Sequence, residues 1–307
     1  MEKSFPVFSE DAGSRVDLFL AEKTGLSRNK ITRAIENGKV TLNGQPIKKH
    51  HQIKIGEVFE LDYQEPAPLK AEPEKIPLKI IFEDKDILVI NKPAGMVTHP
   101  APGNPAGTLV NAVLGYLPEL KKSAEDLRPG LIHRLDKDTS GVMVITKNEK
   151  AQDFLARQLK EGKFQKKYWA VVFGIPKKKE GEIDLPIGRN QRDRKKMAVI
   201  RNEKLRRRSA RTIYRLIEEF NSASLLEVQI ITGRTHQIRV HLLAICHPVL
   251  GDQTYTKKKT NLIGRQALHA KKLGFIHPTS KKFLEFEAEL PQDMKELLEK
   301  LRDLKKP

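Results

Sequence analysis

The residues best suited to chemistry lie in the polar segment of residues 128–147. Asp136 and Asp138 stand there among arginines, directly before an apolar run at residues 142–146 that predicts a buried strand. Charged groups packed against a hydrophobic element have pKa values that their surroundings can shift. A carboxylate in such a place could act as a general base or as a nucleophile. The same acidic side chains could instead only stabilise a turn, as they often do in Asp-x-Asp-Thr-Ser-Gly runs.

Several other chemistries lack their motifs in this sequence. Neither the phosphate-binding pattern G-x-x-x-x-G-K-[ST] nor the dinucleotide-binding pattern G-x-G-x-x-G occurs. Ser140 precedes a glycine but lacks the G-x-S-x-G elbow of serine hydrolases. His236 and His241 are five residues apart and therefore lie on different faces of a helix or strand, which makes them a poor metal pair. The single cysteine, Cys246, excludes a disulfide framework and a multi-cysteine zinc site.

The elements that must position these residues alternate irregularly along the chain. Apolar periodicity predicts helices at residues 109–117 and 151–161 and further strands at residues 168–173, 213–217 and 225–231. Residues 78–93 contain two apolar runs around an acidic turn, which indicates a hairpin. Helices and strands in this order, with several hairpins, indicate an α+β fold rather than a regular parallel sheet.

A small separate domain is expected near the N-terminus, at residues 14–62. Ser14 and Ser27 are each in position to cap a short helix, and Gly38 fits the end of the second one. A short strand and the hairpin signal Asn43-Gly44 follow. We therefore expect two helices followed by a small sheet.

The remaining boundaries follow from composition. Three prolines among alternating charges indicate a linker. The expected organisation is an N-terminal segment at 1–13, the small domain at 14–62, a linker at 63–75 and a large domain at 76–307.

The charge of the chain points to a polyanionic partner. Lys and Arg number 57 and Asp and Glu number 39, which gives a net charge of +18 and a pI near 9.8. Nucleic acid is the first expectation and an anionic membrane the second. Residues 1–62 hold 10 basic and 9 acidic side chains, a net of +1, whereas residues 189–211 hold 11 basic and 2 acidic ones, a net of +9.

The dense basic run repels itself unless it meets an anion. A solvated loop is the alternative to phosphate contact, which would be strongly salt-dependent. The residues expected to touch RNA are Arg192, Arg194, Arg206, Arg207 and Arg208.

Composition also limits where the protein works. A hydrophobic share of 38% is enough for a folded core. No stretch approaches the roughly 18 apolar residues of a membrane span, and residues 1–13 lack the apolar region of a secretion signal. We therefore expect a cytoplasmic protein without a membrane partner.

The small domain resembles a known RNA-binding module. Residues 14–61, from "SRVDLFLAEKTGLSRNKITRAIENGKV" onward, are similar to the domain first known from ribosomal protein S4 of the small subunit. The resemblance implies that the second helix and the loop after the hairpin present basic residues to RNA. Residues in matching places are Arg28, Lys30, Arg33, Lys48 and Lys49. Because the net charge of the domain is close to zero, we expect it to tune placement rather than supply most of the affinity.

The large domain resembles the RluA family of pseudouridine synthases. The stretch "HRLDKDTSG" at residues 133–141 is similar to the family signature, and residues 89–114, 166–174 and 231–255 match further motifs in the right order. The similarity covers roughly residues 76–300. With the small domain in front, the order is that of the RluD-like subgroup, which acts on large-subunit ribosomal RNA.

The resemblance implies a fold, a reaction and a partner. The fold is a mixed, largely antiparallel central sheet flanked by helices and loops. The reaction breaks the N1–C1′ bond of uridine, turns the uracil and rejoins it through C5. No cofactor and no metal are expected, because the reaction is an isomerisation. The implied partner is 23S ribosomal RNA, and a monomer is the expected state.

The resemblance also assigns residues. Asp136 matches the essential aspartate, which could serve as nucleophile or as base. Arg239 matches the arginine that pairs with it and favours its charged form. Tyr168 matches the tyrosine that stacks on the target base. Arg134, beside His133, matches the arginine that fills the space left by the flipped uridine.

Further expectations concern the walls of the cleft. Lys92, Pro93 and His99 are expected to line it. Trp169 lies on the opposite face of its strand from Tyr168 by alternation and is expected to be the core member of the pair.

Three alternative functions stay open at this point. The chain could be a non-catalytic RNA-binding or ribosome-assembly factor, although such a protein has no need of the Asp136, Tyr168 and Arg239 set. It could perform the same reaction on transfer or messenger RNA. A DNA-binding regulator is disfavoured, because no recognition-helix pattern follows the basic run.

Overall fold

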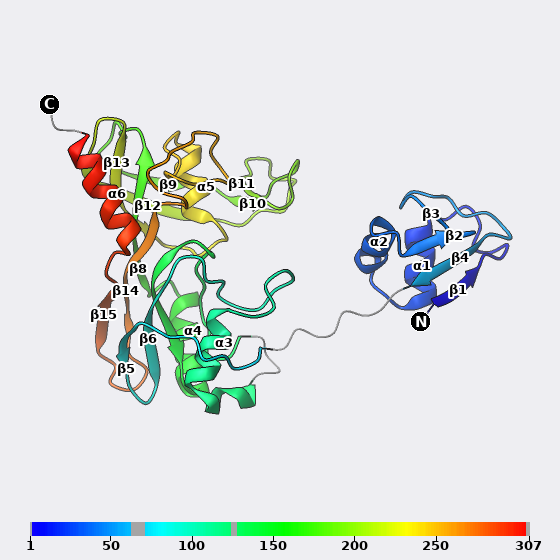
Figure 1. The fold of residues 1–307 in the computed structure, drawn as a ribbon, viewed down its shortest axis with the longest axis horizontal. Coiled ribbons are helices and arrows are strands. Elements are labelled where there is room, and N and C mark those ends of the chain that lie inside the picture. Colours follow the sequence, from blue (N-terminus) through cyan, green and yellow to red (C-terminus); the bar gives the residue numbers. More distant parts are fainter. Residues whose placement is uncertain (1, 63–70, 124–127, 305–307) are drawn as a thin grey trace. The chain divides into compact units, whose positions relative to one another are not determined.

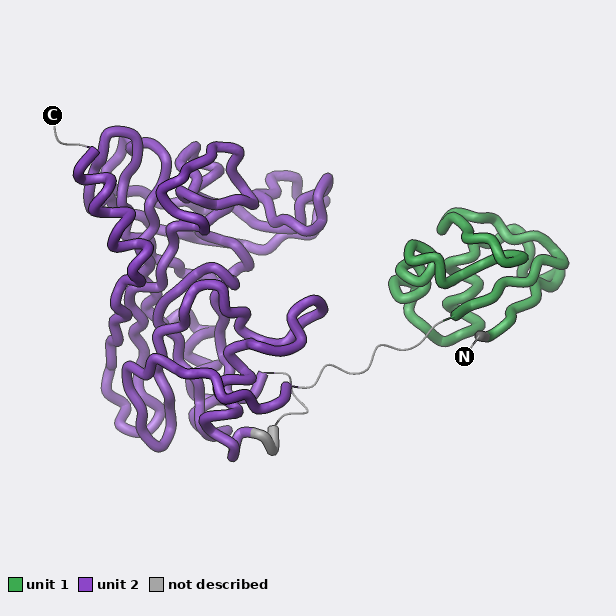
Figure 2. The backbone as a smooth tube through the Cα atoms, in the orientation of Figure 1, with its two compact units in different colours: residues 1–68 green, residues 69–307 purple. Residues whose placement is uncertain are grey.

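The computed structural model describes residues 2–62, 71–123 and 128–304. They form two compact units, Met1–Pro68 and Leu69–Pro307, which Figure 2 colours separately. Each unit is built on its own hydrophobic core. None of the described helices is long and apolar enough to cross a membrane.

The smaller unit packs two helices against an antiparallel sheet (Figure 1). The helices are α1 (Val16–Thr24) and α2 (Arg28–Glu36), and the sheet has the order β1 (Glu2–Pro6), β4 (Val58–Asp62), β2 (Val40–Leu42) and β3 (Gln45–Pro46). Phe19, Leu20, Ile31 and Phe59 lie at the centre of its core, each at most 3% exposed.

Two expectations about this unit are wrong, and two are confirmed. Residues 1–13 are not a separate segment, because β1 pairs with β4 along its whole length and Val7 is buried in the core. Ser14 does not cap α1, since its hydroxyl donates to the carbonyl of Asp11 and the N-cap position is Arg15. Ser27 does cap α2, by accepting from the Lys30 amide, and Gly38 follows the helix with a left-handed φ of 69°.

The larger unit is built on a long sheet. Its described strands are β5 (Ile80–Glu83), β6 (Ile87–Lys92), β7 (Ser140–Thr146), β8 (Gln165–Phe173), β9 (Glu180–Asp184), β12 (Arg211–Glu219), β13 (Ala223–Ile230), β14 (Leu268–Ile276) and β15 (Phe283–Glu287). The order is β5-β6-β7-β14-β8-β13-β12-β9, with β15 paired to β14. Within the described sheet only β7 and β14 are parallel neighbours. The predicted mixed, largely antiparallel sheet is confirmed.

Helices pack on this sheet through their apolar faces (Figure 1). They are α3 (Leu109–Tyr116), the 3₁₀ helix η1 (Pro118–Ser123), α4 (Glu149–Lys160), α5 (Gln237–Ala244) and α6 (Gln292–Asp303). The predicted helices at 109–117 and 151–161 correspond to α3 and α4, and the predicted strands correspond to β7, β8, β12 and β13. The sequence reasoning missed α6, although Met294, Leu297, Leu298 and Leu301 give it a clear apolar face.

A tight approach of backbones fixes the start of β7. Gly141 has a φ of 125°, and a Cβ atom there would lie 2.3 Å from the carbonyl oxygen of Ala270 on β14. Only glycine fits this conformation without strain. The Ser140-Gly141 pair therefore lets β14 close against β7 directly after the turn that carries Asp136.

Two further segments differ from expectation. Residues 63–70 of the expected linker lie outside the described residues, but its end is part of the larger unit, because Ala71 is 3% exposed and the Glu74 amide donates to Asn111 on α3. The dense basic run contains a hairpin, β10 (Ile187–Arg189) and β11 (Met197–Val199). This hairpin was not predicted from the sequence, because the charged residues between its two short strands hide the alternation that is typical of strands.

Candidate active site

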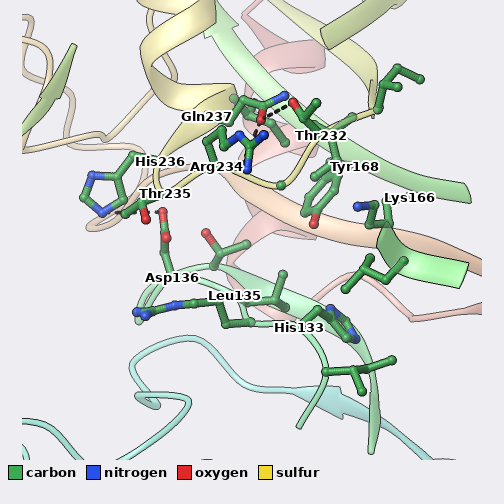
Figure 3. Close-up of a pocket in the computed structure, with 18 of the residues that line it drawn as sticks. His133, Leu135, Asp136, Lys166, Tyr168, Thr232, Arg234, Thr235, His236 and Gln237 are labelled. Atoms are coloured by element: carbon green, nitrogen blue, oxygen red, sulfur yellow. Dashed lines mark hydrogen bonds and ion pairs between the residues drawn. The ribbon is translucent and has the colours of Figure 1, made fainter. Parts of the chain in front are cut away.

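The predicted catalytic side chains line one cleft of about 640 Å³, in which Figure 3 shows Asp136 and Tyr168. Asp136 comes from the turn before β7, Tyr168 from β8 and Arg239 from α5. The loop of residues 231–236, between β13 and α5, forms the facing wall. Segments far apart in the sequence thus place a carboxylate, a ring and a cation around the same space.

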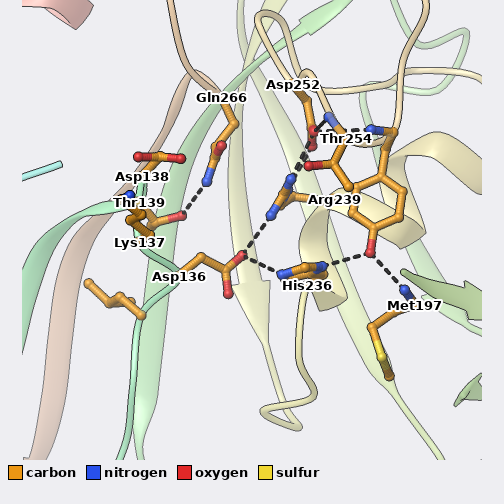
Figure 4. Close-up of polar contacts among 12 residues, drawn as sticks. Asp136, Lys137, Asp138, Thr139, Met197, His236, Arg239, Asp252, Thr254 and Gln266 are labelled. Carbon is orange, nitrogen blue, oxygen red and sulfur yellow. Dashed lines mark hydrogen bonds and ion pairs between the residues drawn. The ribbon is translucent and has the colours of Figure 1, made fainter. Parts of the chain in front are cut away.

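The carboxylate of Asp136 is held by a buried cation (Figure 4). Arg239 Nη1 donates to Asp136 Oδ2 at 3.1 Å, and the Arg239 side chain is 5% exposed. Its Nε and Nη2 donate to Asp252 at 2.6 and 2.8 Å. Although burial alone would lower it, the pKa of Arg239 is raised by these two carboxylates. The guanidinium is therefore fixed by Asp252 and presents its remaining donor to Asp136.

The sequence reasoning missed Asp252. It is 1% exposed, and its Oδ1 also accepts from the amides of Thr254 and Tyr255 at 2.9 and 3.2 Å. This Asx-type turn follows Gly251, which has a φ of 75°. The Gly-Asp pair within the matched motif was the available signal.

The ring of Tyr168 lies between the 133–136 turn and the 231–236 loop (Figure 3). It is 7% exposed, whereas Trp169 is only partly buried, so the expectation that Trp169 is the core member is wrong. The reason is that the side of β8 that lines the cleft also packs on the hydrophobic core, to which Tyr168 belongs. Burial, and secondarily the charge of Asp136, raise the pKa of the Tyr168 phenol, which therefore keeps its proton at neutral pH.

His133, a predicted RNA contact, is also tied to strand β7, and its contact with RNA stays a prediction. Its Nε2 accepts from the Val144 amide of β7 at 3.1 Å, and its ring packs against Phe164. Burial lowers the pKa of His133 to about 3, so the ring is neutral. It lines the cleft but supports strand β7. The neighbouring Arg134 is exposed and lines the cleft as expected.

Lys166 is a cleft cation that the sequence reasoning did not single out. It lies two residues before Tyr168 on β8, so both side chains are on the same face of the strand. Its side chain is 7% exposed, and burial lowers its pKa to about 8. Among the described residues no hydrogen bond or ion pair of its ammonium is found, and the side chain lines the cleft. The cleft therefore holds a second cation besides Arg239 that RNA can meet.

We expected Lys92 to line the cleft, but it does not. It is fully buried, and its Nζ donates to the carbonyls of Pro93, Met96 and Lys137 at 2.7, 2.9 and 3.1 Å. Burial lowers the pKa of Lys92 to about 7. The bond to Lys137 ties the first motif to the turn that carries Asp136. Pro93 is exposed, and only His99 of the three expected residues lines the cleft.

The basic run divides into exposed and structural members. Arg192, Arg194, Arg206 and Arg208 are exposed. Arg207 instead donates to the carbonyls of Ile200 and Arg201 and pairs with Glu203 at 2.5 Å. Arg207 therefore stabilises its own loop, and its role in RNA binding stays a prediction.

The candidate RNA contacts of the smaller unit are partly engaged within it. Arg28 pairs with the buried Asp17 at 2.8 Å, and Lys49 pairs with Glu36 at 2.9 Å. Lys30 is exposed on α2. The role of all three in RNA binding stays a prediction.

Among the described residues, one group of side chains has metal-ligand spacing. Asp84, Asp86 and His277 place ligand atoms within 4.8 Å of one another. The amides of Thr279 and Ser280 donate to His277 Nδ1, so its ring hydrogen lies on Nε2 and is donated to Asp84 at 2.8 Å. This pattern fits a hydrogen-bonded turn, and these residues are not in the cleft lining.

Comparison with known proteins identifies the class. The family RNA pseudouridylate synthase matches residues 86–244, and the S4 domain matches residues 14–59. Human RNA pseudouridylate synthase domain containing 4 has a similar structure, with a TM-score of 0.56 and 28% identity over 73% of this chain and 93% of that one. The chain therefore belongs to the RNA pseudouridine synthase family, and it is an isomerase that acts on RNA.

Relatives over almost the whole length carry more specific names. The chain is 43% identical to the uncharacterized RNA pseudouridine synthase YlyB of Bacillus subtilis, over 95% of this chain and 96% of that protein. It is 42% identical to the ribosomal large subunit pseudouridine synthase D of Zymomonas mobilis, over 95% of each. The family predicted from the sequence motifs is confirmed.

Proposed function

We propose that this enzyme isomerises specific uridines in large-subunit (23S) ribosomal RNA, with Asp136 as the reacting carboxylate. The observation that carries the proposal for Asp136 is its geometry. It is a partly exposed carboxylate in the cleft, held through one oxygen by a cation that a second, buried carboxylate fixes. The rRNA target is supported by relatives of 40–42% identity named ribosomal large subunit pseudouridine synthase D.

The reaction needs Asp136 in its charged form. As a nucleophile it would attack C1′ while the N1–C1′ bond breaks, and as a base it would remove a ribose proton to expel the uracil. In the first route C5 of the turned uracil attacks C1′ and displaces the Asp136 carboxylate, and in the second C5 adds to C1′ while Asp136 returns the proton to the ribose. In both routes C5 then loses its proton and N1 takes one up. All atoms of the substrate stay in the product, so the balance requires no added redox cofactor. Arg239 holds one oxygen of this carboxylate in place in either route.

The other cleft residues serve the extruded base. The uridine must leave its stack, which costs a few kcal/mol. The ring of Tyr168 provides a face on which uracil can stack, and its protonated phenol adds no charge there. Arg134 is exposed at the cleft and long enough to occupy the vacated position in the RNA.

Binding of the RNA is shared between the units in this proposal. The exposed arginines of the β10–β11 region supply phosphate contacts, and the S4 domain places the substrate. Modification of ribosomal RNA during ribosome biogenesis would place the enzyme in the cytoplasm, where we expect it to act as a monomer.

Pseudouridine mapping tests the target and the aspartate together. Total RNA from cells with and without the gene is treated with carbodiimide and read by primer extension across ribosomal and transfer RNAs. We expect stops in 23S RNA that vanish without the gene, return with the wild-type gene and do not return with Asp136→Asn. Unchanged 23S stops, with losses in transfer RNA, would overturn the rRNA target. Full rescue by Asp136→Asn would overturn the role of Asp136.

A further inference from the structure

A chain of contacts links the basic hairpin to Asp136 (Figure 4). The amide of Met197, the first residue of β11, donates to the Tyr255 hydroxyl at 2.9 Å. That hydroxyl lies 2.6 Å from Nδ1 of His236. The other ring nitrogen of His236, Nε2, lies 3.9 Å from Asp136 Oδ2. The sequence reasoning considered His236 only as a metal ligand, so this arrangement was not foreseen.

The direction of each hydrogen bond in this chain can be assigned. A backbone N–H can only donate, so the Tyr255 oxygen accepts from Met197. Burial raises the pKa of the Tyr255 phenol, which therefore keeps its proton and donates it to His236 Nδ1. Burial lowers the pKa of His236, so its ring is neutral at pH 7 and carries one hydrogen. With Nδ1 accepting, that hydrogen lies on Nε2 and faces Asp136.

Tyr255 also packs against the second partner of Asp136. The guanidinium carbon of Arg239 lies 5.0 Å from the Tyr255 ring centroid, and the His236 ring meets Tyr255 edge-on at 5.5 Å. One phenol therefore orders both groups that approach the carboxylate. Both approach the same oxygen, Oδ2, which leaves Oδ1 of Asp136 to face the substrate.

The backbone of His236 is held in a rarely used conformation. Its φ of 56° and ψ of 21° are left-handed, and it occupies the N-cap position of α5 without a side-chain cap. Non-glycine residues adopt this region at a steric cost and cluster at functional sites when they do. The conformation points the imidazole away from capping and toward Tyr255 and Asp136.

We propose that His236 is a positioning residue that orients the Asp136 carboxylate through Nε2–H, and that the β10–β11 hairpin controls it through Tyr255. The inference rests on the proposed role of Asp136. A separation of 3.9 Å is longer than a hydrogen bond, and such contacts often shorten only in the substrate complex. Phosphate contacts by Arg192 and Arg194, in the hairpin loop, would move Met197 and Tyr255 and thereby close the gap.

Two substitutions separate the two ring nitrogens. His236→Asn places an amide oxygen near the position of Nδ1, keeps the acceptor for Tyr255 and tolerates a left-handed backbone, but it does not reach Asp136. His236→Gln places its amide nitrogen near the position of Nε2 and restores a donor to the carboxylate. Single-turnover rates are measured as tritium release from [5-³H]uridine-labelled total RNA of cells that lack the gene.

The expected pattern distinguishes positioning from a structural role. His236→Asn should lower the rate at saturating RNA about 10- to 100-fold, with RNA affinity unchanged, and His236→Gln should recover most of it. Equal losses in both variants, or a wild-type rate in His236→Asn, would overturn the inference. Asp136→Asn is measured in parallel. If it retains activity, the proposed function fails independently of His236.

A double-mutant cycle tests the link to the hairpin. Tyr255→Phe keeps the ring on Arg239 but removes the hydroxyl, and we expect it to slow the reaction about 10-fold. Replacing Arg192 and Arg194 by Gln should slow the saturated rate as well as weaken binding. If the hairpin acts through Tyr255, the combined variant loses clearly less than the product of the two effects. Multiplicative effects would overturn control by the hairpin.

Discussion

Two carboxylates share the guanidinium of Arg239, and the structure predicts opposite consequences of altering them. Asp252 is 1% exposed and makes a bidentate pair, whereas the Asp136 side chain is 19% exposed and accepts a single bond. Asp252→Asn puts an amide N–H group against a guanidinium donor and leaves a buried cation with half of its compensation. Breaking a buried ion pair from one side costs about 3–5 kcal/mol.

This cost converts to a large shift in melting temperature. For a unit the size of residues 69–307, each kcal/mol corresponds to about 3 °C, so Asp252→Asn should lower the Tm of the larger unit by about 12 °C. Asp136→Asn leaves the Asp252 pair intact. Because the Asp136 side chain is partly exposed and an amide oxygen at this position can still accept from Arg239, its Tm should stay within about 3 °C of wild type, although we expect its activity to be lost.

Differential scanning calorimetry provides the measurement, since it can separate the transition of the larger unit from that of the smaller one. Tritium release supplies activity for both variants. If Asp252→Asn melted within about 3 °C of wild type, Asp252 would not be what fixes Arg239. If Asp136→Asn lost as much stability as Asp252→Asn, the division into a structural and a reactive carboxylate would be wrong.

Three further predictions concern the cleft and its surroundings. Because burial lowers the pKa of Lys166 to about 8, the side chain is charged below pH 8 and loses its charge above it. RNA affinity, measured by filter binding, should therefore fall between pH 7 and 9. This fall should vanish in Lys166→Arg, which stays charged over that range. Replacing Arg206 and Arg208 by Gln should weaken RNA binding and reduce the slope of log K against log salt concentration by about 2. The slope is measured by RNA titration over a range of salt concentrations. An unchanged slope would mean that the basic segment 189–211 is a solvated loop. Gly141→Ala should lower the free energy of unfolding of the larger unit by about 3 kcal/mol, because the new Cβ would meet the β14 backbone. Urea unfolding measures this change. Gly264→Ala is the matched control, since a Cβ at that position meets open space.

The sequence predicted elements best where local periodicity is strong. The apolar faces of α3 and α4 gave their bounds to within two residues. Strand β14 was missed because His269, Lys271 and Lys272 interrupt its apolar pattern, although pairing on both sides makes it central. Strand β1 was missed because its register depends on β4, more than fifty residues further along the chain.

Resemblance to family motifs predicted part of the site. The local periodicity of apolar residues predicted none of it. Asp136, Tyr168 and Arg239 were located because whole motifs resembled a family. The burial of Lys166, the lock on Arg239 by Asp252 and the tautomer of His236 each depend on contacts between distant segments. No periodicity in the sequence encodes them, since they follow from packing alone.

The position of β14 in the sheet has a consequence for the order in which activity arises during synthesis. Strands β5, β6 and β7 form one block and β8, β13, β12 and β9 another, and β14 is the strand that joins them. Every motif residue of the cleft precedes residue 256, yet β14 begins only at Leu268. A nascent chain can therefore contain all of the reactive groups before the strand that joins the two blocks has been made. We expect the cleft to become complete only after β14 has paired with both β7 and β8.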